Sequence, residues 1–220
     1  MVWLGWIPAF AGMTTAGPKA ELRKITHMPR IVETIVTTSD TDGNVHIAPL
    51  GLIADGDRWI VAPFKPSKTL ENLRAHPFAA ASHTDDVRVF AGCVTGRKDW
   101  PLTATAKIKG GRLAQCVSHW ELKVDDIIED DLRPRFRCKI VHQESHKAWE
   151  GFSRAQAAVL ELAVLTTRLK MLPPEKIENE LKYLEIAISK TAAPHEEEAW
   201  SWLMEKITAW RATLIKPSGT

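Results

Sequence analysis

Apolar and polar residues alternate over short stretches in the first two thirds of the chain, a pattern typical of half-buried β-strands. The turn signals Asp42-Gly43 and ADGD (residues 54–57) interrupt this pattern. They separate three predicted strands, at residues 31–38, 45–53 and 58–64. The region therefore begins as an antiparallel meander. Pro49 and Gly51 in the second strand indicate an edge, a bulge or a close approach to a ligand.

Beyond the third strand, residues 67–76 predict a short helix that Pro77 ends. Short apolar or alternating stretches then predict four further strands, at residues 78–82, 87–95, 116–124 and 135–142. In the third of these, Trp120 and Leu122 share one face, whereas His119 and Glu121 share the other. Many short strands with frequent turn signals indicate a barrel or a sandwich.

The period changes from two to about 3.6 after residue 150, which predicts helices. Ser153 is a candidate N-cap for the first helix, and prolines stand at the start of the other two. The three predicted helices cover residues 153–172, 173–190 and 194–215. The chain is thus expected to be an α+β protein in which an antiparallel β-domain is followed by a C-terminal three-helix segment.

Composition excludes several classes of protein. The chain has 220 residues and a formal net charge of +2, too small for the electrostatic footprint of a nucleic-acid-binding protein. Its three cysteines are widely spaced, which argues against a disulfide framework or a structural zinc site and favours reduced thiols in the cytoplasm. No apolar run approaches the length of a membrane span, so no membrane partner is expected.

Residues 1–27 do not fit the pattern of the rest. They are apolar, but Pro8 interrupts the stretch and the first cation is Lys19, so the basic start of a secretory signal is lacking. We interpret them as a non-native or disordered extension in front of a natural start at Met28; a signal peptide is the alternative.

Common catalytic signatures are absent from the sequence: no GxSxG, HExxH, P-loop or GxGxxG occurs. His142, Glu144 and His146 lie close together, and His119 is on a predicted strand. Their spacing matches no recognised ligand set, so the prediction is solvated loop side chains and no metal, with a metal site as the minor alternative.

The segment PFKPSKTLENL, residues 63–73, carries the most suggestive local chemistry. A strand leads into a helix start where Ser67, Lys68 and Thr69 stand together. Backbone N–H groups, two hydroxyls and one cation would suit a phosphate. The alternative is that Ser67 simply caps the helix, with Glu71 complementing the helix dipole.

Several segments, in order, resemble the DUF447 family: TTSDTDGNVHIAPLGL, PFKPSKTLENL, HTDDVRVFAG and, in the helical part, FSRAQAAVLELAVLTTRL. The resemblance covers about residues 28–210. It implies a flavin reductase-like split β-barrel that binds flavin mononucleotide (FMN), at residues 28–149, and a helical domain at residues 150–215.

The resemblance also implies a site. The phosphate would lie at Ser67, Lys68 and Thr69. The ring or ribityl chain would lie near His46, Ala48 and Pro49 of the second strand. Asn72, Thr84 and Asp85 would be supporting polar groups. The family often has asparagine just before the threonine that corresponds to Thr84, where this chain has Ser82-His83.

The implied function is hydride or electron transfer through noncovalent FMN, in a cytoplasmic homodimer that uses a small-molecule electron donor or acceptor. Such chemistry resides in the cofactor, so no general acid or base needs to show in the sequence. Two alternatives stay open: a non-enzymatic flavin or ligand binder, such as a carrier or sensor, and a cofactor-free oligomerisation module.

Overall fold

The computed structural model describes residues 29–215, and the interpretation of residues 1–27 as an extension lies outside this range. The chain divides into two compact units, Met1–Arg30 and Ile31–Thr220. The second unit holds all the helices and strands that the structure describes.

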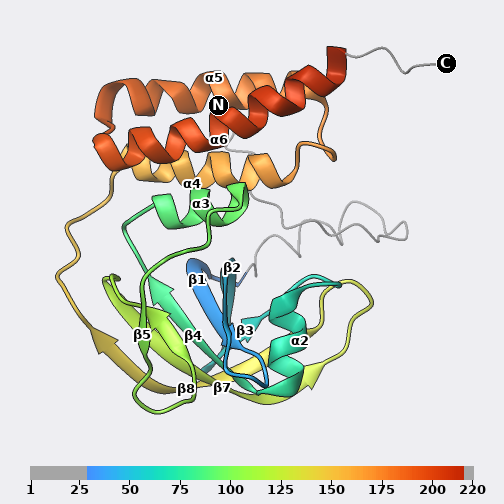
Figure 1. Ribbon diagram of the computed structural model, residues 1–220, viewed down its shortest axis with the longest axis vertical. Coiled ribbons are helices and arrows are strands. Elements are labelled where there is room, and N and C mark those ends of the chain that lie inside the picture. The colour runs from blue at the N-terminus through green and yellow to red at the C-terminus, as the bar shows by residue number, and fades with distance from the viewer. Residues whose placement is uncertain (1–28, 216–220) are drawn as a thin grey trace, which may run out of the picture. The chain divides into compact units, whose positions relative to one another are not determined.

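Six antiparallel strands close into a barrel in the order β1-β2-β3-β8-β7-β4 (Figure 1). They are β1 (Ile31–Ser39), β2 (Val45–Asp55), β3 (Arg58–Val61), β4 (Phe78–His83), β7 (Ser118–Ile128) and β8 (Arg135–Ser145). Helix α2 (Lys68–Ala75) connects β3 to β4 and packs against β1 and β2. The barrel interior is apolar, which explains the observed alternation along the strands. Its buried members include Val36, Leu52, Val61, Leu70, Leu73, Leu122, Phe136 and Cys138.

The β1–β2 hairpin confirms the turn predicted at Asp42-Gly43. The Asp40 carboxylate accepts hydrogen bonds from the backbone N–H groups of Asp42 (3.0 Å) and Asn44 (2.9 Å). Gly43 has φ of 87°, a left-handed conformation that glycine adopts without steric cost. This turn sets the register in which Thr38 lies opposite His46.

Part of strand β2 is an unpaired edge, which agrees with the edge position predicted from Pro49. Only Ile53–Asp55 of β2 pairs with β3, so among the described residues no strand pairs with positions 45–52 on that side. Proline lacks the N–H that a central strand would need, and an edge tolerates it.

The strand predicted at residues 87–95 is wrong: this segment is helix α3 (Arg88–Thr95). Both of its faces are buried, because Val87 and Ala91 pack into the helical core while Val89 and Phe90 pack on the outside of the barrel. A helix covered on both sides has few polar positions, and the resulting apolar run resembles a buried strand.

A second small sheet, β5 (Leu102–Ala104) with β6 (Gly111–Leu113), was not expected from the sequence. Gly111 O accepts a hydrogen bond from Thr37 Oγ1 (2.5 Å), and Ser82 Oγ accepts one from Leu113 N (3.2 Å). These bonds hold β6 on β1 and β4. The loop between β5 and β6 therefore covers part of the barrel's outer surface.

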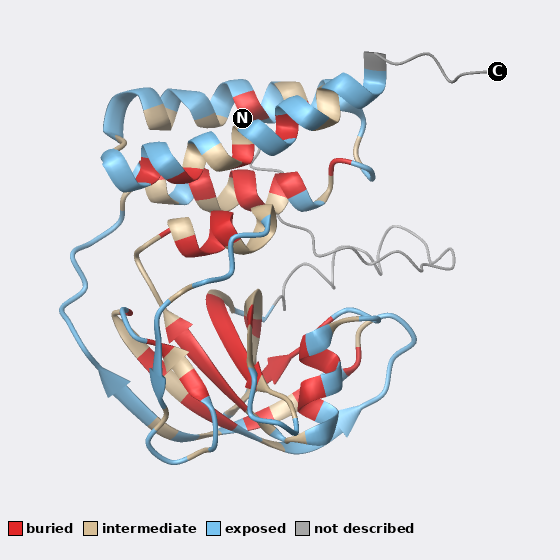
Figure 2. Ribbon diagram, viewed as in Figure 1, coloured by how far each residue is buried: buried red, intermediate tan, exposed pale blue. Residues whose placement is uncertain are grey.

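Three C-terminal helices follow as predicted: α4 (Arg154–Thr167), α5 (Pro174–Thr191) and α6 (Pro194–Ile215). Ser153 caps α4, accepting a hydrogen bond from Gln156 N at 3.3 Å. Figure 2 shows the buried stripes of α4 and α6 facing one another and α3. Their core includes Val159, Leu162, Ile177, Leu181, Leu203 and Ile207. Within residues 29–215, no helix is long and apolar enough to cross a membrane.

Candidate functional site: the start of helix α2

The predicted helix start at Ser67 is confirmed. Ser67 Oγ accepts a hydrogen bond from Leu70 N (3.3 Å), and Ser67 O accepts one from Glu71 N (3.2 Å). No described residue accepts a hydrogen bond from the N–H groups of Lys68 and Thr69. Capping therefore leaves the N–H groups of Lys68 and Thr69 available to a ligand.

Thr69 and Asn72 are both buried at this helix start. Thr69 is 2% exposed, and its hydroxyl has no hydrogen-bond partner within residues 29–215. Asn72 is 1% exposed and donates from Nδ2 to Thr38 Oγ1 at 3.1 Å. The amide thus ties α2 to the end of β1, whereas the threonine hydroxyl remains available.

Two lysines act electrostatically on His46 of β2, and one of them, Lys68, belongs to this helix start. Burial lowers the pKa of His46, and the nearby charges of Lys98 and Lys68 lower it further. Lys68 Nζ lies 3.5 Å from Glu71 Oε2, and both side chains are exposed, so this ion pair contributes little in water. Two free N–H groups, a free hydroxyl and the charge of Lys68 fit a phosphate group, which carries negative charge and several acceptor oxygens.

The loop in front of α2 is held by the β7–β8 turn. Arg133 donates from Nε (3.1 Å) and Nη2 (2.8 Å) to Ala62 O, and its guanidinium lies 4.3 Å from the centre of the Phe64 ring. Leu132 O accepts a hydrogen bond from Lys65 N at 2.9 Å. These contacts fix where Ser67 and the helix start lie, and the sequence did not predict them.

The structure separates the predicted residues of β2. Ala48 lies opposite Val36, a member of the barrel interior, whereas Pro49 lies opposite Ile35, on the outer face. His46 is two positions from Ala48 and shares its face. His46 and Ala48 can therefore serve one ligand, and Pro49 faces the other way.

Thr84 and Asp85 lie away from this group. Strand β4 runs antiparallel to β1, with Ala80 opposite Thr37 and Ser82 opposite Ile35. The end of β4 at His83 therefore lies toward the start of β1, away from the Thr38–Asn72 contact at the end of β1. Thr84 Oγ1 accepts a hydrogen bond from Asp86 N (3.1 Å), and Asp85 pairs with Lys147 at 2.7 Å. Both residues border the linker to α4, where a surface hollow is lined by Asp85, Trp149, Phe152 and Gln156.

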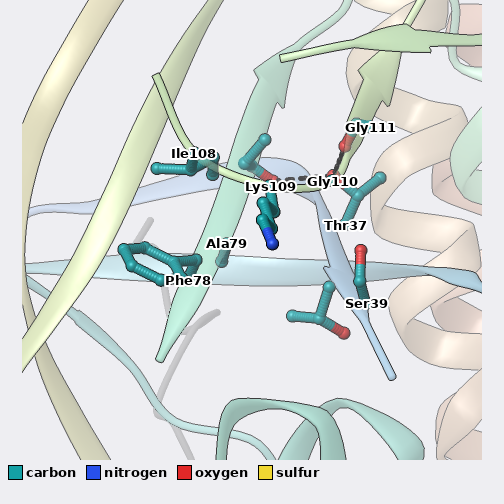
Figure 3. Close-up of a pocket in the computed structure, with 10 residues that line it drawn as sticks. Thr37, Ser39, Phe78, Ala79, Ile108, Lys109, Gly110 and Gly111 are labelled. Atoms are coloured by element: carbon teal, nitrogen blue, oxygen red, sulfur yellow. Dashed lines mark hydrogen bonds between the residues drawn. The ribbon is translucent and has the colours of Figure 1, made fainter. Parts of the chain in front are cut away.

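A narrow hollow lies between the end of β1, the start of β4 and the loop before β6. Figure 3 shows Lys109 lying across it, between Phe78 and Ser39. The space is too tight for a flavin ring, but it adjoins Thr38, the residue that binds Asn72. Sequence reasoning missed it, because its walls come from three segments that only folding brings together.

Two family models match the chain. The DUF447 N-terminal domain, described as a protein of unknown function, matches residues 32–147, and DUF447 matches residues 153–205. The chain belongs to the DUF447 family. The family resemblance seen in the sequence is therefore confirmed.

Solved structures agree with the fold of this DUF447 protein. An FMN-bound DUF447 protein from Methanosarcina mazei has a TM-score of 0.70 at 21% identity, covering 83% of this chain and 99% of that one. The 2-nitrobenzoate 2-nitroreductase of Pseudomonas fluorescens is more distant, with a TM-score of 0.46 at 20% identity, covering 64% and 77%. The predicted split β-barrel with C-terminal helices is confirmed. Among curated proteins no match was found.

Proposed function

We propose that this DUF447 protein binds FMN noncovalently, with the phosphate at the start of α2. The observation that carries the proposal is the set of unused donors there, the N–H groups of Lys68 and Thr69 and the Thr69 hydroxyl, beside the side-chain charge of Lys68. The FMN-bound relative from Methanosarcina mazei, which has the same fold, supports this choice of ligand.

Each residue then has a role that follows from its position. Ser67 caps the helix and fixes the direction of the free N–H groups. Asn72 holds α2 against β1, and His46 and Ala48 border the ligand from β2. Thr84 and Asp85, at the other end of β4, are proposed contacts of the ring end of the flavin, and Pro49 is assigned to the strand edge.

The proposed reaction is hydride or electron transfer between a small-molecule donor and an acceptor. The flavin supplies the redox chemistry, and the protein supplies binding and orientation. The second candidate is a flavin carrier or sensor without turnover. Oxidation of a reduced nicotinamide by the FMN-loaded protein, at a rate well above that of free FMN, supports the enzyme. Bound flavin without such turnover supports the carrier or sensor.

The phosphate site is tested by comparing FMN with riboflavin. Lys68→Ala and Thr69→Ala should each weaken FMN binding roughly ten- to hundredfold, because a hydrogen bond to a charged group contributes about 1.5–3 kcal/mol. Riboflavin lacks the phosphate, so its affinity should change little. Titration by flavin fluorescence measures both.

Lys170→Ala provides the control, since Lys170 is exposed and far along the chain from α2. It should leave both affinities unchanged. If the variants at residues 68 and 69 weaken both flavins equally, the defect lies in the helix and the phosphate assignment is wrong. If neither flavin binds the wild-type protein, the cofactor-free alternative stands.

A further inference from the structure

We propose that the outer face of strands β7 and β8 carries a site for a divalent transition metal ion of the Zn²⁺ type, bound by His119, His142, Glu144 and His146. This site is separate from the proposed flavin site. It also differs from the expectation of solvated loop side chains, because His119, His142 and Glu144 all lie within strands.

Strand pairing brings the four side chains together. His119 on β7 lies directly opposite Glu144 on β8, and its neighbour on the same face, Glu121, lies opposite His142. His146 follows β8 directly and its N–H donates to Val117 O at 2.8 Å, which continues the pairing. Strand β8 and the residue that follows it thus present three candidate ligands, His142, Glu144 and His146, beside His119 on β7.

A β-bulge directs His142 to this face. The register shifts between Glu121 and Leu122, so that Leu122 lies opposite Ile140 while Glu121 lies opposite His142. Without the shift, Ile140 and His142 would point to the same side. The extra residue allows Ile140 to pack toward the barrel interior and His142 to join the polar face.

Buried Glu121 sets the tautomer of His119. The carboxylate is fully buried and accepts hydrogen bonds from the backbone N–H groups of Ala106 (2.5 Å), Lys107 (2.7 Å) and Ile108 (2.9 Å). Its Oε1 also lies 3.3 Å from His119 Nε2. A carboxylate only accepts, so His119 Nε2 carries the proton and Nδ1 presents a lone pair to the cluster. A carboxylate behind a ligating histidine is a recurrent feature of metal sites.

The spacing of three of these ligands suits one ion, and His146 lies beside His119. His119 Nδ1 lies 2.9 Å from His146 Nε2. Two nitrogens bound to one tetrahedral Zn²⁺ at about 2.0–2.1 Å are about 3.3 Å apart. One ligand atom from each of His119, His142 and Glu144 falls within 4.8 Å of the others. The side chains of His142 and Glu144 are partly exposed, which leaves them room to rotate toward a shared ion.

An unused nitrogen supports the assignment. His142 Nε2 is buried and has no hydrogen-bond partner among the described residues, and it lies 3.7 Å from Glu144 Oε2, beyond hydrogen-bond reach. Buried polar atoms nearly always have partners, so an ion bound to His142 Nε2 would explain why this nitrogen has no hydrogen-bond partner. Three histidines and one carboxylate, all from the protein, form the closed set typical of a structural site.

The test uses the full chain without a histidine tag, stripped with a chelator and then dialysed. Titration with Zn²⁺ by calorimetry, and with Co²⁺ by visible absorption, should show one tight ion per chain. Zn²⁺ should also raise the melting temperature. His142→Ala and Glu144→Gln should each weaken binding at least tenfold, and the melting temperature of the metal-free proteins should stay near the wild-type value.

His195→Ala is the matched control, because His195 is exposed on α6 and outside the cluster. It should bind metal like the wild-type protein. Stoichiometry well below one ion per chain, or unchanged affinity in both cluster variants, would overturn the proposal. Since flavin plays no part in these measurements, the result is independent of the proposed function.

Discussion

Gly92 shows how a single residue decides the packing of α3. A Cβ placed on it would lie 2.7 Å from Trp100 Cζ2 and 3.0 Å from Arg97 O. The glycine therefore lets the indole ring lie directly on the helix. Helix propensity alone would favour alanine here by about 1 kcal/mol.

Gly92→Ala is expected to destabilise the protein by about 1–3 kcal/mol, against the propensity, because the added methyl group overpacks a filled space. Urea denaturation measures the change. In a Trp100→Ala background the same substitution should cost less, since the ring has gone and only the contact with Arg97 O remains. A loss of equal size in both backgrounds would show that the contact with Trp100 is not the cause.

His83 is a half-buried histidine whose protonation opposes folding. Burial lowers its pKa below the ordinary value, and its Nε2 has no hydrogen-bond partner among the described residues. The unfolded chain therefore binds a proton more readily than the folded chain. The contribution of His83 to the free energy of unfolding is therefore fully present above about pH 6.5 and is lost as the pH falls below that value.

Denaturation at several pH values between about 5 and 8 checks this dependence. His83→Asn should flatten the slope, because asparagine does not titrate in this range. His195→Asn should leave it as in the wild-type protein, since His195 is exposed. An unchanged slope in His83→Asn would contradict the assignment.

Among the elements, the β7–β8 hairpin has a role beyond closing the barrel. Its turn holds the β3–α2 loop through Arg133 and Leu132, and thus positions the helix start proposed to bind phosphate. Arg133 uses two nitrogens on one carbonyl and covers Phe64 with its guanidinium plane, a combination that lysine does not reproduce.

Arg133→Lys should therefore lower the free energy of unfolding by about 1–3 kcal/mol. It should also reduce the affinity for FMN more than that for riboflavin. Arg135→Lys, at an exposed position of the same hairpin, should change neither quantity. Equal effects of the two substitutions would show that the hydrogen bonds from Arg133 to Ala62 O are not the cause.

At the scale of the whole molecule, the unpaired edge of β2 and the exposed aromatic pair Trp149 and Phe152 offer surfaces for a second copy. Phe152 is 100% exposed and Trp149 is 53% exposed, with ring centres 5.6 Å apart. Large apolar side chains grouped on a surface mark interaction sites more often than isolated ones do.

We expect a homodimer in solution, in which the second copy covers the open side of the flavin. Light scattering coupled to size exclusion should give about twice the chain mass of 24.6 kDa. Phe152→Ser should shift the population toward monomer, whereas Tyr183→Ser, at another exposed aromatic, should not. A monomer that still binds FMN would contradict this expectation.

Much of the architecture followed from the sequence because its signals are local. Period-two alternation and the Asp42-Gly43 turn predicted the β1–β2 hairpin. Helical spacing with Ser153 and Pro174 at helix starts predicted the C-terminal helices. The order of motifs identified the family, and a hydroxyl-rich helix start led to the proposed phosphate site. Each of these depends on residues within a few positions of one another.

Tertiary structure alone decided the rest. Helix α3 was misread because cores on both sides bury it, which erases the polar face that marks a helix. The grouping of His46 with Lys98, the tether from Arg133 to Ala62, and the burial of Glu121 under the β5–β6 loop join residues far apart in the chain. The histidine cluster depends further on a one-residue bulge, because side chains alternate along a strand and a single inserted residue reverses which face they occupy.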